Sequence, residues 1–343
     1  MIWNREAETT PQAVRERLQL ERLQETVRWA VARVPFHRER LGAATIGALS
    51  RISPASRSSI RRRMLGREGL MSDLARDMMT KIDRGVRLES ADEMTPEYRE
   101  NLVHLLTMQA DSELAGGYGY VPWITKAPTV EEKHVVAQIV KDELRHATVM
   151  YGLLADLGFD VESHGRQHDE IFTMRIDTNR DIGTARITSD KRVNIFYYPI
   201  DTWADFIFFN FCMDRGAGHQ LEDVRGSSYG PWVRAIDGIF KEEKFHIRHG
   251  EHWVRKLAED STTHDEAQAT FNKWYVRTLN IFGRPGSPKN ELYRQYKLKL
   301  RDNDDVRQAF AAEVKGLCAT FGLSVPAWKP KWSELPEDAQ IPG

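Results

Sequence analysis

Cysteine is scarce in this sequence, which has only Cys212 and Cys318 among its 343 residues. An iron–sulfur cluster or a zinc site held by four cysteines therefore cannot form within this chain. So few cysteines also indicate a reducing compartment, and we expect the protein to be cytoplasmic.

Long hydrophobic runs and an excess of one charge are also missing. The most apolar run, Phe206 to Met213, is far too short to span a bilayer. The first residues, Met1-Ile2-Trp3, lead directly into charged sequence and do not read as a signal peptide. Lys and Arg together number 49 and Asp and Glu 50, so no global charge favours nucleic acid. We therefore expect neither a membrane nor a nucleic-acid partner.

What the sequence does contain is one pattern that occurs twice: a lone carboxylate, the length of a helical hairpin, and then Glu-x-x-His. The carboxylate precedes the glutamate by 30 positions in the first copy (143 − 113) and by 29 in the second (243 − 214). The residues are Glu113, Glu143 and His146, followed by Asp214, Glu243 and His246.

A spacing of three turns a helix by roughly 300°, so the glutamate and histidine of each motif share one face. One carboxylate from each of two helices and Glu-x-x-His from each of two others form the ligand set of a dinuclear site in a four-helix bundle. Carboxylates are hard ligands that can bridge two metals, and imidazole suits iron. We predict that the six residues bind two iron ions, with iron plus manganese as the alternative.

A single Glu-x-x-His is weak evidence, and the chain has a third, from Glu131 to His134. We reject this one because it follows Pro128-Thr129 and lies in the first turn of a helix, where acidic residues favour the helix dipole. The other two motifs could instead form surface ion pairs with Arg145 and Lys244. The doubled spacing argues against that interpretation.

The pattern predicts a mainly α protein built on a ferritin-like four-helix bundle. The bundle helices are expected over residues 95–116, 129–158, 201–220 and 230–256. Thr95-Pro96 is a typical helix start, and Gly116-Gly117 is expected to end the first helix.

Residues 165–200 read differently. Thr173–Ile176 and Val193–Tyr198 are rich in β-branched and aromatic residues, which predicts a β-hairpin inserted between the bundle halves. We divide the chain into an N-terminal helical extension (1–90), the bundle with additional C-terminal helices (91–325) and a proline-rich tail (326–343).

Several segments together resemble a known family. Trp123–Thr129 with Lys141–His146, and Ser228–Trp232 with Lys241–His246, closely resemble the catalytic subunits of phenylacetyl-CoA epoxidases. The related benzoyl-CoA epoxidases share the ligand spacing, and Pro199–Gln220 looks closer to them. The resemblance covers roughly residues 95–325.

The resemblance implies that the six residues of the doubled pattern are iron ligands, all of them present in this chain. It also implies an O2-dependent di-iron oxygenase that epoxidises or hydroxylates the ring of an aromatic acyl-CoA in aerobic aromatic catabolism. Implied partners are a separate NAD(P)H-dependent flavin/Fe–S reductase and a non-catalytic ferritin-like paralogue. The sequence has no strand–Gly-x-Gly-x-x-Gly–helix unit for a nicotinamide or flavin of its own.

Candidate substrate residues follow from position. Phe209, Met213 and Phe240 lie on the helices that carry the predicted ligands. They are candidates for lining the substrate pocket, and the alternative is that they belong to the ordinary core of the bundle. Lys126, Lys133 and Lys141 lie on the segment that leads into Glu143. They are candidates for contacting the anionic CoA, and the alternative is that they are ordinary surface lysines.

Two alternatives stay open. The same bundle could serve an iron-handling protein, or a di-iron hydroxylase or N-oxygenase with a substrate other than a CoA ester.

Leu20–Leu41 is similar to the N-terminal segment of phenylacetate-CoA ligases, but no ATP-phosphate loop follows it, so we infer no ligase activity.

Overall fold

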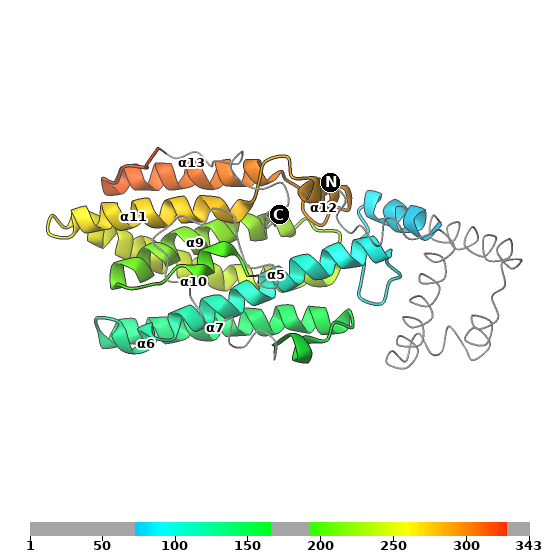
Figure 1. Ribbon diagram of the computed structural model, residues 1–343, viewed down its shortest axis with the longest axis horizontal. Helices are drawn as coiled ribbons and strands as arrows, with labels where there is room; N and C mark the ends of the chain where they lie inside the picture. Colours follow the sequence, from blue (N-terminus) through cyan, green and yellow to red (C-terminus); the bar gives the residue numbers. More distant parts are fainter. Residues whose placement is uncertain (1–72, 166–191, 328–343) are drawn as a thin grey trace, which may run out of the picture. The chain divides into compact units, whose positions relative to one another are not determined.

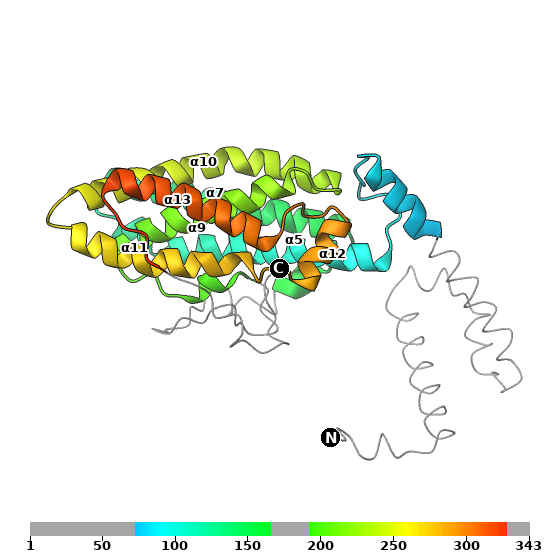
Figure 2. The ribbon, with the colours of Figure 1, turned by 90° about the horizontal axis from the view of Figure 1, so that it is seen from above.

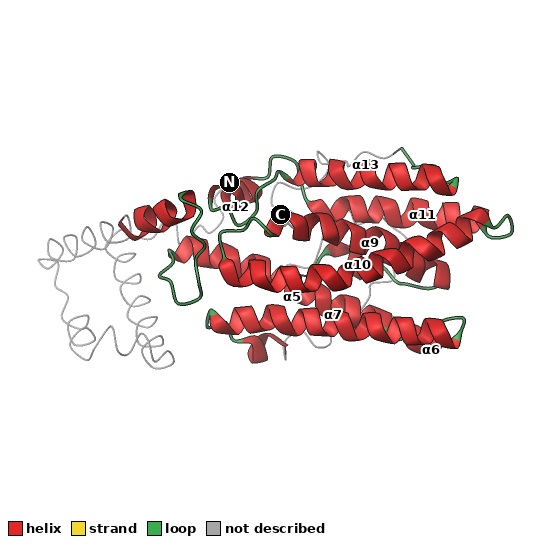
Figure 3. Ribbon diagram, turned by 180° about the vertical axis from the view of Figure 1, so that it is seen from behind, coloured by secondary structure: helices red, strands yellow, loops and turns green. Residues whose placement is uncertain are grey.

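The computed structural model describes residues 73–165 and 192–327, and these residues are mostly helical (Figure 1). Within those two ranges no β-strand forms, and Leu88 and Tyr229 make an isolated bridge (Figure 3). The prediction of a mainly α fold is confirmed. The ligase-like segment, Thr173–Ile176 and the end of the tail lie outside the described residues.

Four long helices form the bundle. α5 packs against α7 and α9 packs against α10, while α7 also contacts α10. The helices lie lengthwise beside one another in two perpendicular views (Figures 1 and 2). Their bounds are α5, Pro96–Tyr120; α7, Val130–Asp156; α9, Trp203–Val224; and α10, Gly230–Glu259. The connections within each pair are short, as in an antiparallel ferritin-like bundle.

Three of these helices begin at a threonine that caps the free N–H groups of the first turn. The Thr95 hydroxyl accepts from the N–H of Tyr98, and the Thr129 hydroxyl accepts from a backbone N–H in the first turn of α7. Thr202 and Asp205 form a reciprocal capping box at the start of α9. Each such cap typically stabilises a helix by about 1 kcal/mol, so the sequence itself sets where these helices start.

The predicted end of the first helix is wrong, because α5 continues through Gly116 and Gly117 to Tyr120. These glycines are packing positions. A Cβ on Gly116 would lie 3.0 Å from Oε2 of Glu143, and one on Gly117 would lie 3.0 Å from Cδ2 of Leu144. The missing side chains let α5 approach α7 closely.

The described part of the expected hairpin is also wrong. Val193–Tyr198 contains a short 3-10 helix, η2 (Asn194–Tyr197), where a strand was predicted. The residues Ile195, Phe196 and Tyr198 are all buried in the core, on a segment with no alternation of faces. Their apolar character therefore reflects burial and not strand pairing.

The remaining helices cover the bundle. α11 and α13 pack against α9, and α11 also contacts α10. The connecting elements are short: α6 between α5 and α7, and η3 and α12 between α11 and α13. The bounds are α6, Trp123–Lys126; α11, His264–Leu279; η3, Asn280–Phe282; α12, Pro288–Gln295; and α13, Asn303–Phe321.

The compact unit that contains the bundle begins at Leu74. Met78 and Ile82, on the helical stretch before α5, are buried in the same core as the bundle helices. Among the described residues, no helix has both the length and the apolar character needed to cross a membrane.

Candidate metal centre

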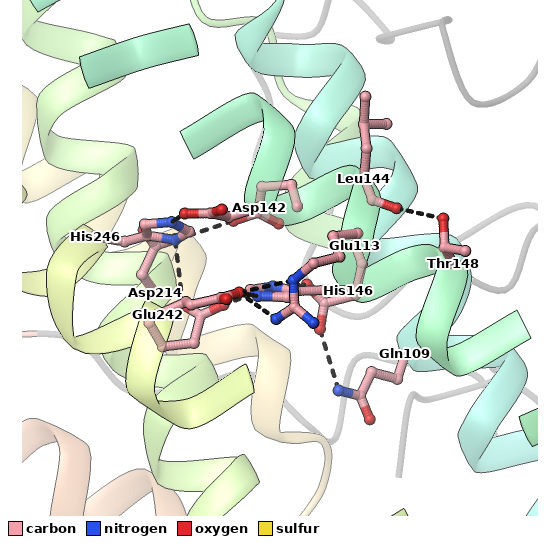
Figure 4. Close-up of polar contacts among 12 residues, drawn as sticks. Gln109, Glu113, Asp142, Leu144, His146, Thr148, Asp214, Glu242 and His246 are labelled. Atoms are coloured by element: carbon pink, nitrogen blue, oxygen red, sulfur yellow. Dashed lines mark hydrogen bonds and ion pairs between the residues drawn. The ribbon is translucent and has the colours of Figure 1, made fainter. Parts of the chain in front are cut away.

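The six residues of the doubled pattern come together in the middle of the bundle. α5 contributes Glu113, α7 contributes Glu143 and His146, α9 contributes Asp214, and α10 contributes Glu243 and His246. Figure 4 labels four of them: Glu113, His146, Asp214 and His246. Their ligand atoms form two groups, each with all atoms within 4.8 Å of one another. The groups are Glu113, Glu143, His146 and Glu243, and Asp214, Glu243 and His246.

Glu243 belongs to both groups. Its Oε1 lies 3.2 Å from Nδ1 of His146, and its Oε2 lies 3.6 Å from Nδ1 of His246. Each histidine also faces one further carboxylate: Glu113 is 3.6 Å from His146, and Glu143 is 3.4 Å from His246. A carboxylate with one oxygen toward each histidine is placed to bridge two cations.

The donor set suits two divalent cations. Both Nδ1 atoms are buried and, among the described residues, have no hydrogen-bond partner, which in a folded protein calls for an explanation such as an ion. Four ionised carboxylates carry four negative charges, equal to the positive charge of two divalent ions. Oxygen and imidazole ligands suit iron and manganese.

Each histidine has an acidic partner on the opposite helix. Nε2 of His146 lies 2.8 Å from Glu242 of α10, and Nε2 of His246 lies 3.5 Å from Asp142 of α7 (Figure 4). Such partners orient a metal-bound imidazole and raise its basicity. Arg145 pairs with Glu242 in turn. Sequence reasoning missed both acids, although each one directly precedes the glutamate of its Glu-x-x-His motif.

The lone carboxylates are also held by neighbours. Gln109 donates to Glu113 at 3.1 Å, and Gln109 itself accepts from the indole N–H of Trp232 at 2.9 Å. Asp214 accepts hydrogen bonds from Asn210 and, at 3.4 Å, from the Tyr120 hydroxyl. Hydrogen bonds from neighbouring side chains therefore orient both lone carboxylates.

The carboxylates and histidines of the cluster shift one another's pKa values. Burial lowers the pKa of His146, but Glu113 and Glu243 outweigh it and raise that pKa to about 11. Burial is the main cause that raises the pKa of Glu143 to about 7. Burial raises the pKa of Glu243, but His246 and His146 outweigh burial and lower this pKa to about 2. Near neutral pH, His146 and part of Glu143 therefore carry protons that a cation must displace.

We expect apparent affinity for Mn(II), a redox-stable probe, to increase as pH rises from 6 to 8. The pKa of Glu143 is about 7, so this side chain is mostly protonated at lower pH. At higher pH its carboxylate is ionised and can bind a cation. Titration calorimetry in buffers of different ionisation enthalpy should record proton release. Constant affinity over this range without proton release would contradict the assignment.

The third motif does not contribute. Glu131 and His134 are exposed on the first turns of α7. Between them, Glu132 accepts a hydrogen bond from His249 at 2.8 Å. This short motif reflects a helix start, as expected.

A cavity of about 90 Å³ opens directly onto the cluster. Its wall includes the carboxylates of both predicted groups, together with Phe209 and Met213. Apart from these residues, the wall is mostly apolar; it includes Leu105, Met108, Phe196 and Leu221.

Two predicted substrate residues lie elsewhere. Phe240 does not line the cavity, and its ring packs below Arg225 and Lys244. Lys126 is exposed, with its ammonium group over the Trp123 ring, at the α6 end of the bundle. Along α5 the residues that line the cavity run from Leu105 to Tyr120, on both sides of Glu113, and Lys126 is not among the lining residues.

Lys133 and Lys141 are not at the cavity either. Lys133 donates to the carbonyls of Thr125 and Ala127, which ties α6 to the start of α7. Lys141 is exposed beside Gln138. A contact of either lysine with CoA therefore stays a prediction for the part of the ligand outside the cavity.

A bundle of this kind, with a carboxylate–histidine cluster at its centre, defines the class of ferritin-like four-helix carboxylate proteins. Within that class, a model of the phenylacetic acid catabolic protein family matches residues 71–337. The chain belongs to this family.

Two curated relatives are similar to the chain. A 1,2-phenylacetyl-CoA epoxidase subunit from Escherichia coli (strain K12) is 29% identical over 249 residues, which are 72% of this chain and 75% of that protein. Benzoyl-CoA oxygenase component B from Aromatoleum evansii is 26% identical over 230 residues, 67% of this chain. That match spans 45% of the Aromatoleum protein.

Proposed function

We propose that this chain is the oxygenase subunit of a di-iron enzyme that inserts one atom of O2 into the ring of an aromatic acyl-CoA. Epoxidation is the favoured outcome and ring hydroxylation the variant. The observation that carries the proposal is the cavity, because its lining combines the carboxylates of both groups with mostly apolar side chains. The names of the two relatives support an aromatic acyl-CoA as substrate.

The proposed ligands of the two iron ions are Glu113, Glu143, His146, Asp214, Glu243 and His246. When bound, the ions would supply the activation of O2. The chain itself excludes water and holds the ring: Phe209 and Met213 face the same cavity as Asp214. Keeping bulk water from the reacting atoms limits side reactions in such a site.

The proposal requires electrons from outside the chain. Insertion of one oxygen atom, with the other leaving as water, consumes two electrons and two protons. Cys212 and Cys318 are both buried and free, and two thiols cannot hold a four-cysteine cluster. A separate NAD(P)H-dependent reductase is therefore part of the proposal, as is a non-catalytic paralogue that completes the assembly.

An iron-handling protein is the competing function. It uses the same kind of bundle, but a mostly apolar cavity that also holds the buried cation Lys299 gives a hydrated cation few ligands on its way to the centre. Gel filtration distinguishes the two, because storage requires a large cage.

The test is turnover with defined substrates. Iron-loaded protein is incubated under O2 with phenylacetyl-CoA, benzoyl-CoA or the free acids, with NADPH and a flavin/Fe–S reductase. We expect a mass gain of one oxygen with a CoA ester, none with the free acids, and none when the reductase is omitted. Oxygenation of the free acid in preference to the ester would overturn the proposed substrate class.

A further inference from the structure

Lys299 lies at the cavity and has no role in the metal centre. It sits in the loop between α12 and α13, and it is one of the residues that line the cavity beside the carboxylate cluster. Only 6% of its surface is exposed. Among residues 73–165 and 192–327, its ammonium group forms no hydrogen bond or ion pair. A buried donor without an acceptor is costly, and proteins keep one where a ligand supplies the acceptor.

The charge of Lys299 is balanced although its N–H groups are unused. Asp223 and Asp302 are its negative neighbours and Arg301 is its positive one, so the four groups sum to zero. Asp223 already accepts from the backbone N–H groups of Leu300 and Arg301 and from the Arg301 side chain. The burial of Lys299 lowers its pKa. A site with balanced charge and free N–H donors suits a neutral acceptor better than an anion.

The loop that carries Lys299 is held rigidly. Lys297 has a φ of 51°, a left-handed conformation that is rare for a residue other than glycine. Ser228 fixes this turn: its backbone N–H donates to the carbonyl of Lys297, and its hydroxyl donates to the carbonyl of Tyr296, both at 2.7 Å. Strain of this kind persists only where the surroundings enforce it, and it is common at binding sites.

Lys299 and the carboxylates of the candidate metal centre line different parts of the cavity along α9. The loop is bonded to Asp223, next to Val224 at the C-terminal end of α9, whereas Asp214 lies in the middle of that helix. Ten helical residues separate Asp214 from Val224, about 15 Å at 1.5 Å per residue. Apolar residues such as Leu221 line the space between them. The part of the cavity between Lys299 and the carboxylates is thus lined by apolar residues such as Leu105, Leu221 and Val224, together with the side-chain amides of Gln109 and Gln220.

We propose that Lys299 donates a hydrogen bond to the carbonyl oxygen of the substrate's acyl group and so directs the aromatic ring toward the carboxylate cluster. This inference rests on the proposed function, which supplies an aromatic acyl thioester. Such a ligand fits this arrangement. Its neutral carbonyl oxygen can accept from Lys299, and its apolar ring can lie among the apolar side chains between Lys299 and the carboxylates.

The test compares two ligands that differ only at the carbonyl: phenylacetyl-CoA and its thioether analogue 2-phenylethyl-CoA. Binding to the full-length, metal-loaded chain is measured by calorimetry without O2. We expect the wild type to bind the thioester about 10- to 100-fold more tightly, the range for a hydrogen bond to a charged donor. Lys299→Met should bind both ligands equally, and Lys299→Arg should regain part of the preference.

The matched control is Lys297→Met in the same loop. The Lys297 ammonium points elsewhere, to Asp83 at 2.9 Å, so this variant should keep the wild-type preference. Lys299→Met should unfold at the same temperature as the wild type or higher, because it removes a buried ammonium group whose N–H donors have no acceptor. If Lys299→Met fails to fold, Lys299→Gln serves instead, with a reduced preference expected.

The outcomes separate the inference from the proposed function. A wild type that binds both ligands equally, or a Lys299→Met variant that keeps the preference, overturns the role of Lys299 and leaves the proposed function standing. A wild type that binds neither CoA ligand overturns the proposed substrate and this inference with it. Tighter binding of free phenylacetate, lost in Lys299→Met, would assign the lysine to a carboxylate and also overturn the proposal.

Discussion

A Glu243→Ala variant is expected to lose both metal ions and all turnover while its helices remain intact. Glu243 is the carboxylate shared by the two ligand groups, with one oxygen toward each histidine. Its removal therefore weakens both positions at once. The wild type should carry about two metal ions per chain, as the six-ligand set implies. Metal content, circular dichroism and acyl-CoA turnover are the measurements.

The control for this variant is Glu259→Ala on the same helix. Glu259 is exposed and pairs with Arg255 on the surface, so metal content and turnover should stay at the wild-type level. Glu143→Ala should also abolish turnover, because Glu143 supplies the second carboxylate beside His246. Full metal content and turnover in either ligand variant would refute the predicted centre.

The helices and the residues of the candidate site could be predicted from the sequence because they depend on local periodicity. Glu143 and His146 share a face at a spacing of three whatever else the chain does. The threonine caps act within one turn of a helix. The pairing of Asp142 with His246, and of Glu242 with His146, joins different helices. It required the relative rotation of α7 and α10, which no local pattern specifies.

The full lining of the cavity could not be predicted, for a similar reason. Lys126 is a candidate because it precedes α7 in sequence, with a plain surface position as the alternative, and it is exposed at the α6 end of the bundle. Lys299 lies more than fifty residues beyond His246 in sequence and reaches the cavity through the contact of its loop with Asp223. Tertiary packing alone brings it there. A lysine outside every motif gives no signal in a single sequence.

The glycines of α5 were misread for a different physical reason. A Gly-Gly pair is a common helix terminator, and nothing local distinguishes it from a pair that makes room for a neighbouring helix. Gly116 makes room for the side chain of Glu143 itself, so its small size bears on the metal centre as well as on packing.

Substitution of Gly116 by valine is accordingly expected to impair the metal centre while the bundle still folds. Its Cβ would lie 3.0 Å from Oε2 of Glu143 and 3.5 Å from the Phe196 ring, and the branched methyl groups add further bulk. The carboxylate, as the end of a flexible side chain, must move away and can no longer hold its ligand position. We expect the loss of at least one metal ion per chain and a fall in turnover of more than about 100-fold, as small displacements at a reacting centre produce.

The matched variant is Gly152→Val on α7, where a Cβ would meet nothing within 4 Å. Valine is a slightly better helix former than glycine, so this variant should fold, bind metal and turn over substrate like the wild type. The pair separates the effect of valine in a helix from the effect of crowding Glu143. If Gly116→Val bound two metal ions and kept full turnover, the carboxylate of Glu143 would not be a metal ligand in its present position. The group of Glu113, Glu143, His146 and Glu243 would then lose Glu143 as a proposed ligand.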